Sequence, residues 1–289
     1  MRPHTAGRYV DATLGAGGHA RGILEACAPD GRLLGLDLDP QALALARETL
    51  APFGQRASLA QASYTSLPAQ IAQMGWDAVD GILLDLGISS MQVDTPERGF
   101  SFLHDAPLDM RFSPLNPVRA ADLVNGLPHD ELTELLFRYG EEPLAKRIAQ
   151  SIVRARPIST TFELVAAIES VSPRRGRVHP ATKTFQALRI AVNEELASVE
   201  ETLPKAVAAL RAGGRLAVIS FHSLEDRIVK DFFREQSREL INPPYEQIYQ
   251  TERKAILKEI NRKPIIASEA EVTENPRSRS AKLRVAEKI

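Results

Sequence analysis

The sequence predicts a doubly wound α/β domain interrupted by a helical domain, and three observations support this. Short apolar runs alternate with helical segments over the first ninety residues, as in a parallel sheet covered by helices on both faces. From about residue 117 to 210 the chain reads as helical, with no convincing strand. Strand character returns at 213–220 and at 281–287. A length of 289 residues allows about two domains, or one domain with a large insertion.

The elements of the predicted sheet follow in order along the chain. Helical segments run up to about Ala28, from Pro40 onward and from Leu67 to Met74. Asp39-Pro40 opens the second of these, because Asp caps a helix and Pro fits its first turn. The strands are predicted at 8–14, 33–36, 57–60, 81–84, 213–220 and 281–287.

Helical periodicity defines the insertion. The longest segment carries one apolar stripe with steps of three or four residues, which predicts a single amphipathic helix. This stripe consists of Phe185, Leu188, Val192, Leu196, Val199 and Leu203. The helices are predicted at 130–139, 143–154, 161–170 and 181–210, and a further helix at 224–236 follows the fifth strand. We therefore expect one domain formed by 1–94 and 201–289, and a helical insertion at 95–200.

Composition excludes several classes of protein. Apolar residues make up 44% and charged residues 25%, so disorder and disulfide scaffolds are excluded. The formal charge of -1, taken alone, argues against a nucleic-acid partner. Cys27 is the only cysteine, and no apolar run is long enough for a signal peptide or a membrane span. We expect a soluble cytoplasmic protein with no membrane partner.

A glycine-rich turn marks a nucleoside site. Gly15-x-Gly17-x-x-Ala20 lies between a strand and a helix, and Asp37 ends the next strand, 22 residues after Gly15. Glycines allow close approach of a ligand, and the acidic group can bind ribose hydroxyls. Asp11, ahead of the glycines, suits a ligand with an ammonium group and would repel a pyrophosphate. This favours S-adenosylmethionine over NAD, with an NAD-linked oxidoreductase as the alternative.

Seven longer motifs give the chain a resemblance to a known family. In this order they closely resemble the bacterial ribosomal RNA small-subunit methyltransferase H family (MraW type), over nearly the whole chain. The family usually has a His-x-Pro-Val-x-Leu segment before the first strand, where this chain has Met1 to Gly7. The motifs are Asp11-Ala-Thr-Leu-Gly-Ala-Gly-Gly-His19, Asp80-Gly-Ile-Leu-Leu-Asp-Leu-Gly-Ile-Ser-Ser90, Glu97-Arg-Gly-Phe-Ser-Phe102, Pro107-Leu-Asp-Met-Arg111, His179-Pro-Ala-Thr-Lys-Thr-Phe-Gln-Ala-Leu-Arg189, Ser220-Phe-His-Ser-Leu-Glu-Asp-Arg227 and Glu274-Asn-Pro-Arg-Ser-Arg-Ser280.

The resemblance implies a fold, an activity and a set of site residues. The fold is a Rossmann-like class I S-adenosylmethionine-dependent methyltransferase sheet with an inserted all-helical domain. The activity is methylation of the exocyclic N4 of a cytidine in the 16S rRNA decoding centre, in the P-site region. Asp85, where the fourth strand ends, is the candidate catalytic residue, because the amine needs an acceptor there. The implied cofactor contacts are Gly17, Gly18, His19, Asp37, Tyr64, Asp85 and Gln92.

Substrate contacts are predicted from charge and from aromatic residues that could stack on a base. Residues 138–189 hold ten basic and four acidic side chains, and the residues after Asn275 hold five basic and one acidic. Such clusters suit RNA phosphates, although a solvated surface is the simpler alternative. Phe100 could stack on a base or pack the insertion, and His222 could face the substrate or cap the next helix. The predicted RNA contacts are Arg174, Arg175, Arg177, Phe100 and His222.

Three other readings of the sequence are weaker. Asn242-Pro-Pro-Tyr245 spells an amino-methyltransferase tetrapeptide, but no buried strand precedes it, so we expect a loop. Ser220, His222 and Asp226 lack the glycine elbow and distant partners of a hydrolase triad. The six histidines show no metal-ligand spacing, so no protein-held metal is predicted.

The remaining expectations concern partners. 16S rRNA, within the small ribosomal subunit, is the expected partner. A non-catalytic RNA-binding or assembly factor stays as a further alternative. The oligomeric state stays open, with a homodimer among the choices.

Overall fold

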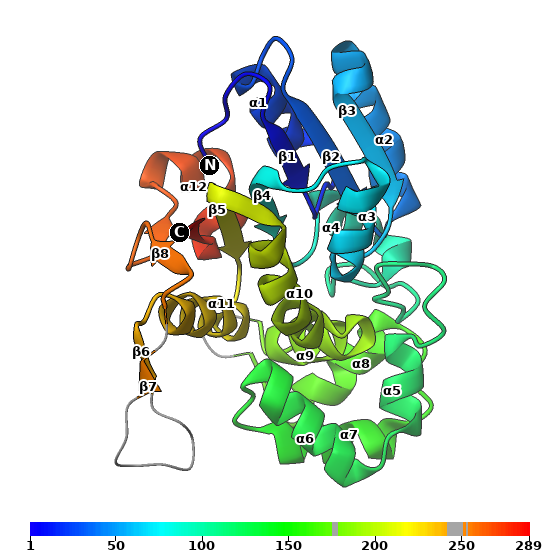
Figure 1. Cartoon of the computed structure of the whole chain (residues 1–289). Helices are drawn as coiled ribbons and strands as arrows, with labels where there is room; N and C mark the ends of the chain where they lie inside the picture. The colour runs from blue at the N-terminus through cyan, green and yellow to red at the C-terminus, as the bar shows by residue number, and fades with distance from the viewer. Residues whose placement is uncertain (175–178, 242–250, 253) are drawn as a thin grey trace. The chain divides into compact units, whose positions relative to one another are not determined.

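The computed structural model describes residues 1–174, 179–241, 251–252 and 254–289 (Figure 1). They form two compact units, one made of Met1–Gly87 with Leu196–Ile289 and the other of Ile88–Glu195. The boundaries predicted at 94 and 200 lie a few residues C-terminal to the observed ones. None of the helices in the described part of the chain is both long and apolar enough to span a membrane.

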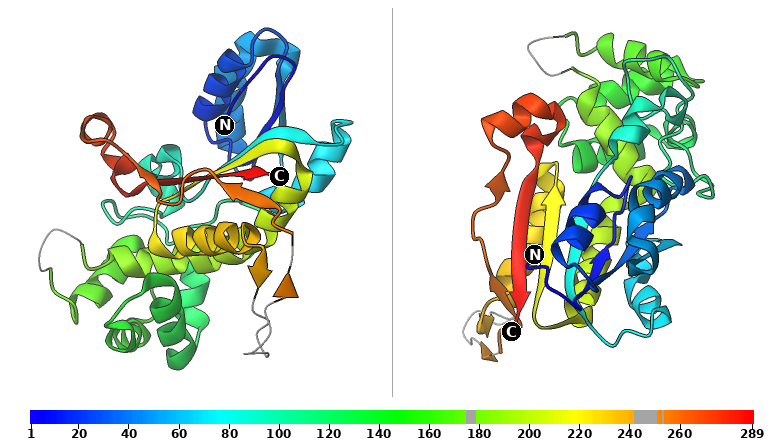
Figure 2. Two further views of the ribbon diagram at one scale, coloured as in Figure 1. Left: turned by 60° about the vertical axis from the view of Figure 1, so that its left-hand side comes forward. Right: turned by 90° about the horizontal axis from the view of Figure 1, so that it is seen from above.

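The first unit is built on one sheet with the strand order β3-β2-β1-β4-β5-β10-β8, and β9 also pairs with β10. The pairs from β3 to β5 are parallel, whereas β10 runs antiparallel to β5, beside which it lies in Figure 2. The strands are β1 (Arg8–Asp11), β2 (Arg32–Asp37), β3 (Ala57–Gln61), β4 (Val79–Asp85), β5 (Leu210–Ser220), β8 (Leu257–Glu259), β9 (Ile265–Ile266) and β10 (Lys282–Lys288). This arrangement confirms the predicted Rossmann-like sheet.

Two apolar clusters cover the two faces of this sheet. Neighbouring strand residues point to opposite faces, so Tyr9 joins one cluster and Val10 the other. The Tyr9 cluster receives α1 (Gly18–Ala26) and α2 (Pro40–Leu50), and the Val10 cluster receives the other three main helices. These three are α3 (Leu67–Gln73), α10 (Glu195–Ala209) and α11 (Ser223–Gln236). The layering is what buries the near-continuous apolar strands.

The second unit has a core of its own. Its described residues form helices and loops, with one isolated β-bridge between Pro107 and Thr160. The helices are α4 (Ser90–Asp94), α5 (Ala120–Gly126), α6 (His129–Gly140), α7 (Ala145–Ala155), α8 (Thr161–Glu169) and α9 (Thr182–Asn193), with the 3-10 turn η3 (Pro96–Arg98). Leu132, Ile148 and Leu164, from three of these helices, are fully buried together. The predicted all-helical insertion is therefore confirmed.

One predicted helix is wrong. The apolar stripe at 181–210 belongs to two helices, because Glu194 adopts a left-handed backbone with φ of 51° and ends α9. Phe185 and Leu188 then enter the core of the helical unit, whereas Val199 and Leu203 pack on the sheet. A periodicity of 3.6 residues continues across such a break, so it does not reveal the change of partner.

Several short elements lie outside the predictions. They are η1 (Ala51–Arg56), η2 (Tyr64–Ser66), β6 (Leu240–Ile241), β7 (Thr251–Glu252), α12 (Glu269–Glu274) and η4 (Pro276–Ser280), besides α4, η3, α5, β8 and β9. β6 pairs antiparallel with β7. The tetrapeptide at 242–245 lies outside the described residues. β1 ends at Asp11 rather than at residue 14, because the chain turns there to form the glycine loop.

Candidate active site

Three aspartates end three neighbouring strands of the sheet unit. Asp11, Asp37 and Asp85 are the last residues of β1, β2 and β4, and β1 pairs with both of the other strands. Carboxyl ends of parallel strands meet at one edge of a sheet, where open α/β sheets bind their ligands. The structure therefore brings together the predicted acidic residues of the site.

The glycine turn closes this edge between β1 and α1. Gly15 and Gly17 have φ of 52° and 85°, a left-handed conformation that L side chains rarely adopt. The N–H of Leu14 donates to the carbonyl of Leu36 at 2.9 Å, which anchors the turn to β2. A Cβ added at Gly15 or at Gly18 would meet nothing within 4 Å. The backbone is therefore open to a ligand at the start of α1.

Backbone N–H groups hold the Asp37 carboxylate in place. Gly15 donates to one oxygen and Asp39 to the other, each at 2.8 Å. Burial nevertheless raises the pKa of Asp37 above its ordinary value, because desolvation outweighs these bonds. The same side chain that is predicted to bind ribose thus also fixes the glycine turn.

Asp11 is the most deeply buried acid of the site. Its side chain is inaccessible to solvent, and Oδ1 receives only a long bond of 3.3 Å from the N–H of Thr13. Oδ2 has no hydrogen-bond partner in the described structure. The pKa of Asp11 is raised from 3.8 to about 7, mainly by burial; the charges of Asp85 and Asp37 act in the same direction, and His19 and the N–H of Thr13 oppose it.

His19 connects the start of α1 with the end of β4. Its Nε2 lies 3.4 Å from Oδ2 of Asp85, and the interaction with this carboxylate raises the pKa of His19. The N–H of Asp85 in turn donates to the hydroxyl of Thr13 at 2.5 Å. Oδ1 of Asp85 is buried without a partner among the described residues. The hydroxyl of Thr13 is a positioning contact that the sequence analysis did not identify.

Tyr64 comes into the same region from β3. Asp37 pairs with Gln61 in the sheet, and Tyr64 follows three residues later as the first residue of η2. Its partly buried ring packs against the apolar cluster that contains Leu67. Tyr64 therefore lies just after β3, the strand that pairs with β2, and β2 ends at Asp37.

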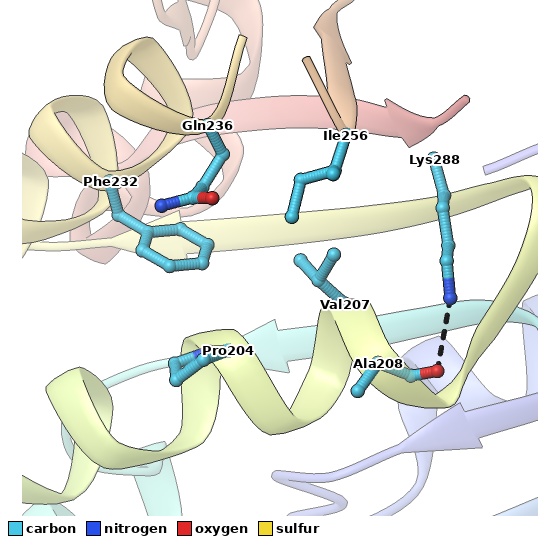
Figure 3. A pocket seen from close by; sticks show the side chains of 7 residues that line it. All are labelled: Pro204, Val207, Ala208, Phe232, Gln236, Ile256 and Lys288. Atoms are coloured by element: carbon cyan, nitrogen blue, oxygen red, sulfur yellow. Dashed lines mark hydrogen bonds between the residues drawn. The ribbon is translucent and has the colours of Figure 1, made fainter. Parts of the chain in front are cut away.

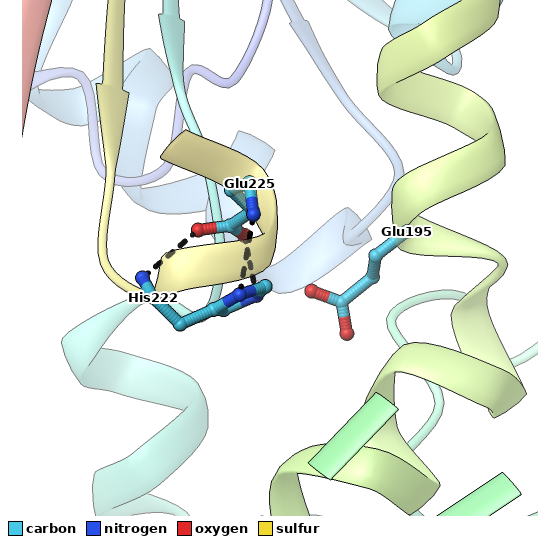
Figure 4. Close-up of side chains that lie close together, drawn as sticks. All are labelled: Glu195, His222 and Glu225. Atoms are coloured by element: carbon cyan, nitrogen blue, oxygen red, sulfur yellow. Dashed lines mark hydrogen bonds and ion pairs between the residues drawn. The ribbon is translucent and has the colours of Figure 1, made fainter. Parts of the chain in front are cut away.

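His222 caps a helix. Its Nδ1 accepts from the N–H of Glu225 at 3.4 Å, and Oε2 of Glu225 accepts from the N–H groups of Phe221 and His222, which together form a capping box (Figure 4). The imidazole Nε2 also lies 3.1 Å from Oε1 of Glu225. This favours the capping alternative over substrate contact. Asp226 is bound by Arg284 and Lys282, so the hydrolase arrangement is not formed.

The other predicted site residues belong to the helical unit. Gln92 is 6% exposed and forms a capping box with Ser89 at the start of α4. Phe100 is buried and stacks on Phe112 with ring centroids 5.8 Å apart, which favours the packing alternative over stacking on a base. Arg174 is exposed and pairs with Glu169 at 2.7 Å. Arg175 and Arg177 lie outside the described residues.

Part of the predicted basic surface has structural roles. Arg156 donates to the carbonyls of Val124 and Leu127 at 2.6 and 2.5 Å. Arg189 forms two bonds with Glu195. In the C-terminal cluster, Lys282 and Arg284 bind Asp226, and Lys288 donates to two backbone carbonyls. The exposed basic residues of the helical unit include Lys146, Arg147 and Arg154 on α7.

A separate hollow of about 240 Å³ lies on the sheet unit, in part between α10 and α11 (Figure 3). Val207 and Phe232 give it an apolar lining, and the Lys288 ammonium donates to the carbonyl of Ala208 at 3.0 Å. It contains no carboxylate and no glycine turn among its lining residues. It therefore lacks the groups that would hold a nucleoside.

Comparisons with known proteins identify the family of this chain. The family model described as the MraW methylase family matches residues 1–289. A ribosomal RNA small subunit methyltransferase H from Geotalea uraniireducens is 53% identical, over 100% of this chain and 95% of that protein. The protein of the same name from Dehalococcoides mccartyi is 52% identical, over 98% and 81%. The crystal structure of an rRNA methylase from Streptococcus thermophilus matches with a TM-score of 0.45 and 11% identity, over 100% of this chain and 90% of that one. The chain belongs to the MraW methylase family, and its cofactor is S-adenosylmethionine.

Proposed function

We propose that this protein methylates 16S rRNA of the small ribosomal subunit, at the exocyclic N4 of a cytidine in the decoding centre (P-site region). The names of its relatives support rRNA of the small subunit as the substrate class. The motif resemblance supports the cytidine and its position. The observation that carries the proposal is the set of three strand-end carboxylates around an open glycine turn. Such a substrate places the enzyme in the cytoplasm.

The hydrogen-bond acceptors of the site fit S-adenosylmethionine. Oδ2 of Asp11 and Oδ1 of Asp85 are buried acceptors without a partner, and a ligand with ammonium, amine and hydroxyl groups supplies donors. A dinucleotide would instead bring its pyrophosphate towards these acids. The residues that we propose to hold the cofactor are Gly17, Gly18, His19, Asp37, Tyr64, Asp85 and Gln92.

The residues at the end of β4 would prepare the amine. The lone pair of cytosine N4 is delocalised into the ring, so the amine must be oriented to react. When bound, S-adenosylmethionine supplies an electrophilic methyl group on a sulfonium. We assign Asp85 to accept a hydrogen bond from the amine, which turns the nitrogen lone pair towards this methyl group. His19, whose Nε2 lies 3.4 Å from Oδ2 of Asp85, orients the carboxylate.

Mass spectrometry of 16S rRNA tests this function. In a strain that lacks the protein, one cytidine should lose one methyl group on N4, and the wild-type gene should restore it. Asp85→Asn should restore it poorly, because the amide retains the shape of the side chain but brings an N–H donor towards the amine. Unchanged methylation in the deletion strain would support the assembly-factor alternative. Calorimetry with S-adenosylhomocysteine and with NAD distinguishes the methyltransferase from the oxidoreductase alternative. Binding of NAD without binding of S-adenosylhomocysteine would support the oxidoreductase.

A further inference from the structure

The helical unit has a hollow of about 390 Å³ in its surface. The volume lies in the range of small-molecule pockets, roughly 300–1,000 Å³. Phe102 and His179 line it together with Phe162, which projects from α8. Leu103, 70% exposed, contributes further apolar surface. The hollow therefore presents three aromatic rings from three separate segments of the chain.

Two of these rings form a fixed platform. The rings of Phe102 and His179 are stacked, with centroids 4.4 Å apart and planes inclined by 21°. Phe185, which is buried in the core, meets Phe102 edge-on at 5.4 Å. A platform held by the core loses little conformational entropy when a flat ligand stacks beside it. Phe162 is 47% exposed and is the ring that a ligand reaches most easily.

Polar groups at the same place are arranged in a defined way. Nδ1 of His179 accepts from the N–H of Ala181 at 3.1 Å, which places the ring hydrogen on Nε2. Nε2 lies 3.4 Å from Oε1 of Glu169, and the same oxygen accepts from Nε of Arg174 at 2.7 Å. Burial and the charge of Arg174 lower the pKa of His179, which favours the neutral imidazole. The hollow thus combines aromatic faces with a carboxylate and a guanidinium.

We propose that this hollow binds one unpaired base of the RNA substrate. Proteins recognise single-stranded RNA by stacking splayed bases on aromatic or histidine rings and by bonding their edges. The Glu169 carboxylate suits the exocyclic amine of a cytosine or an adenine. Arg174, at the surface, suits the adjoining phosphate. The inference rests on the proposed function and adds to it a second base-recognition site, on the helical unit.

Charge favours RNA over an apolar protein segment as the occupant. α7 packs against α8 through the hydroxyl of Ser151, which donates to the carbonyl of Ala167 at 2.7 Å. α7 carries three exposed basic side chains, Lys146, Arg147 and Arg154, and no acidic one. An apolar peptide would gain nothing from these charges, whereas a polyanion would.

Binding of a fluorescein-labelled single-stranded RNA, measured by anisotropy, tests the proposal. Phe162→Ala removes an exposed ring, and Phe137→Ala on α6 is the matched control, because Phe137 is 63% exposed and does not line the hollow. We expect Phe162→Ala to weaken binding on the order of ten-fold, as for loss of one stacked base. Phe137→Ala should bind as the wild type does. Equal affinity of the two variants would overturn the proposal.

A Phe162→Trp variant provides a direct signal. Trp76 is the only native tryptophan and is buried in the sheet unit, so fluorescence gained by the variant reports on the hollow. RNA should quench it. Quenching by the assembled small subunit but not by its isolated rRNA would assign the hollow to a ribosomal protein instead.

Methylation of the small subunit by the wild-type protein is measured in parallel. If the wild-type protein methylates the subunit while both alanine variants bind RNA equally, only the base-binding inference fails. Absence of methylation by the wild type would contradict the proposed function itself.

Discussion

Nε2 of His19 lies 3.4 Å from Oδ2 of Asp85, so the first turn of α1 and the last residue of β4 are joined across the glycine loop. This interaction raises the pKa of His19 above the usual value near 6.5. We expect NMR titration of the wild type to show this raised pKa. Asp85→Asn should lower it, because the negative partner is lost. Asp130 is an exposed carboxylate of the helical unit, so Asp130→Asn should leave the pKa of His19 unchanged. If the pKa of His19 were equal in all three proteins, His19 and Asp85 would not interact in solution.

Asp11 makes stability depend on pH. Its pKa is raised by burial from the ordinary 3.8 to about 7, so the folded protein retains a proton that the unfolded chain has lost. Between pH 4 and 7 the unfolding free energy should therefore fall as pH rises, by at most roughly 4 kcal/mol at 1.36 kcal/mol per pKa unit. The raised pKa of His19 acts in the same direction. Asp11→Asn should flatten the pH dependence of urea unfolding between pH 4 and 7, and a profile as steep as that of the wild type would contradict this assignment.

Asp37 should affect both cofactor affinity and the glycine turn. Asp37→Asn retains the size of the side chain but can accept from only one of the N–H groups of Gly15 and Asp39. We expect S-adenosylhomocysteine to bind roughly ten- to hundred-fold more weakly by calorimetry, as for loss of a charged hydrogen bond. The melting temperature should fall as well, since the carboxylate also stabilises the turn. Wild-type affinity in this variant would remove Asp37 from the cofactor site.

Most of the fold could be predicted because the parallel strands are buried on both faces. Leu33 to Leu36 and Gly81 to Leu84 are almost wholly apolar, and each strand stops at an aspartate. β8 and β9 were not predicted, because a strand of three or two residues has too little alternation to detect. The break at Glu194 was also missed, since its left-handed backbone carries no glycine signal.

The candidate site was predictable where spacing determines it and not where side-chain packing does. The position of Asp37 after Gly15 follows from the βαβ unit. Burial of Phe100 and exposure of Phe162 depend on how the helices pack, and both residues are simply phenylalanines in the sequence. Contact between the Thr13 hydroxyl and the N–H of Asp85, 72 residues apart, depends on β1 pairing with β4.

The basic face of α7 predicts a salt effect. If Lys146 and Arg147 each contact one phosphate, the double alanine variant should lower the slope of log affinity against log salt by about 1.4 for a single strand. Lys230→Ala on α11, an exposed lysine beside Asp231, is the control and should keep the wild-type slope. Cofactor affinity should be the same in all three proteins. A slope unaffected by the double substitution would remove α7 from the RNA surface.

Arg154 and Arg156 are two residues apart and should behave in opposite ways. Arg156 bonds two backbone carbonyls of the helical unit, so Arg156→Met leaves both acceptors without their charged donor and should reduce the unfolding free energy by about 2–4 kcal/mol. For Arg156→Met, the slope of log RNA affinity against log salt should stay at the wild-type value. Arg154, exposed on α7, should show the reverse: Arg154→Met should change stability by less than about 0.5 kcal/mol and lower the slope by about 0.7. Urea unfolding and anisotropy titrations on both proteins measure the two effects separately. If both variants lost stability equally and retained the slope, neither arginine would be an RNA contact.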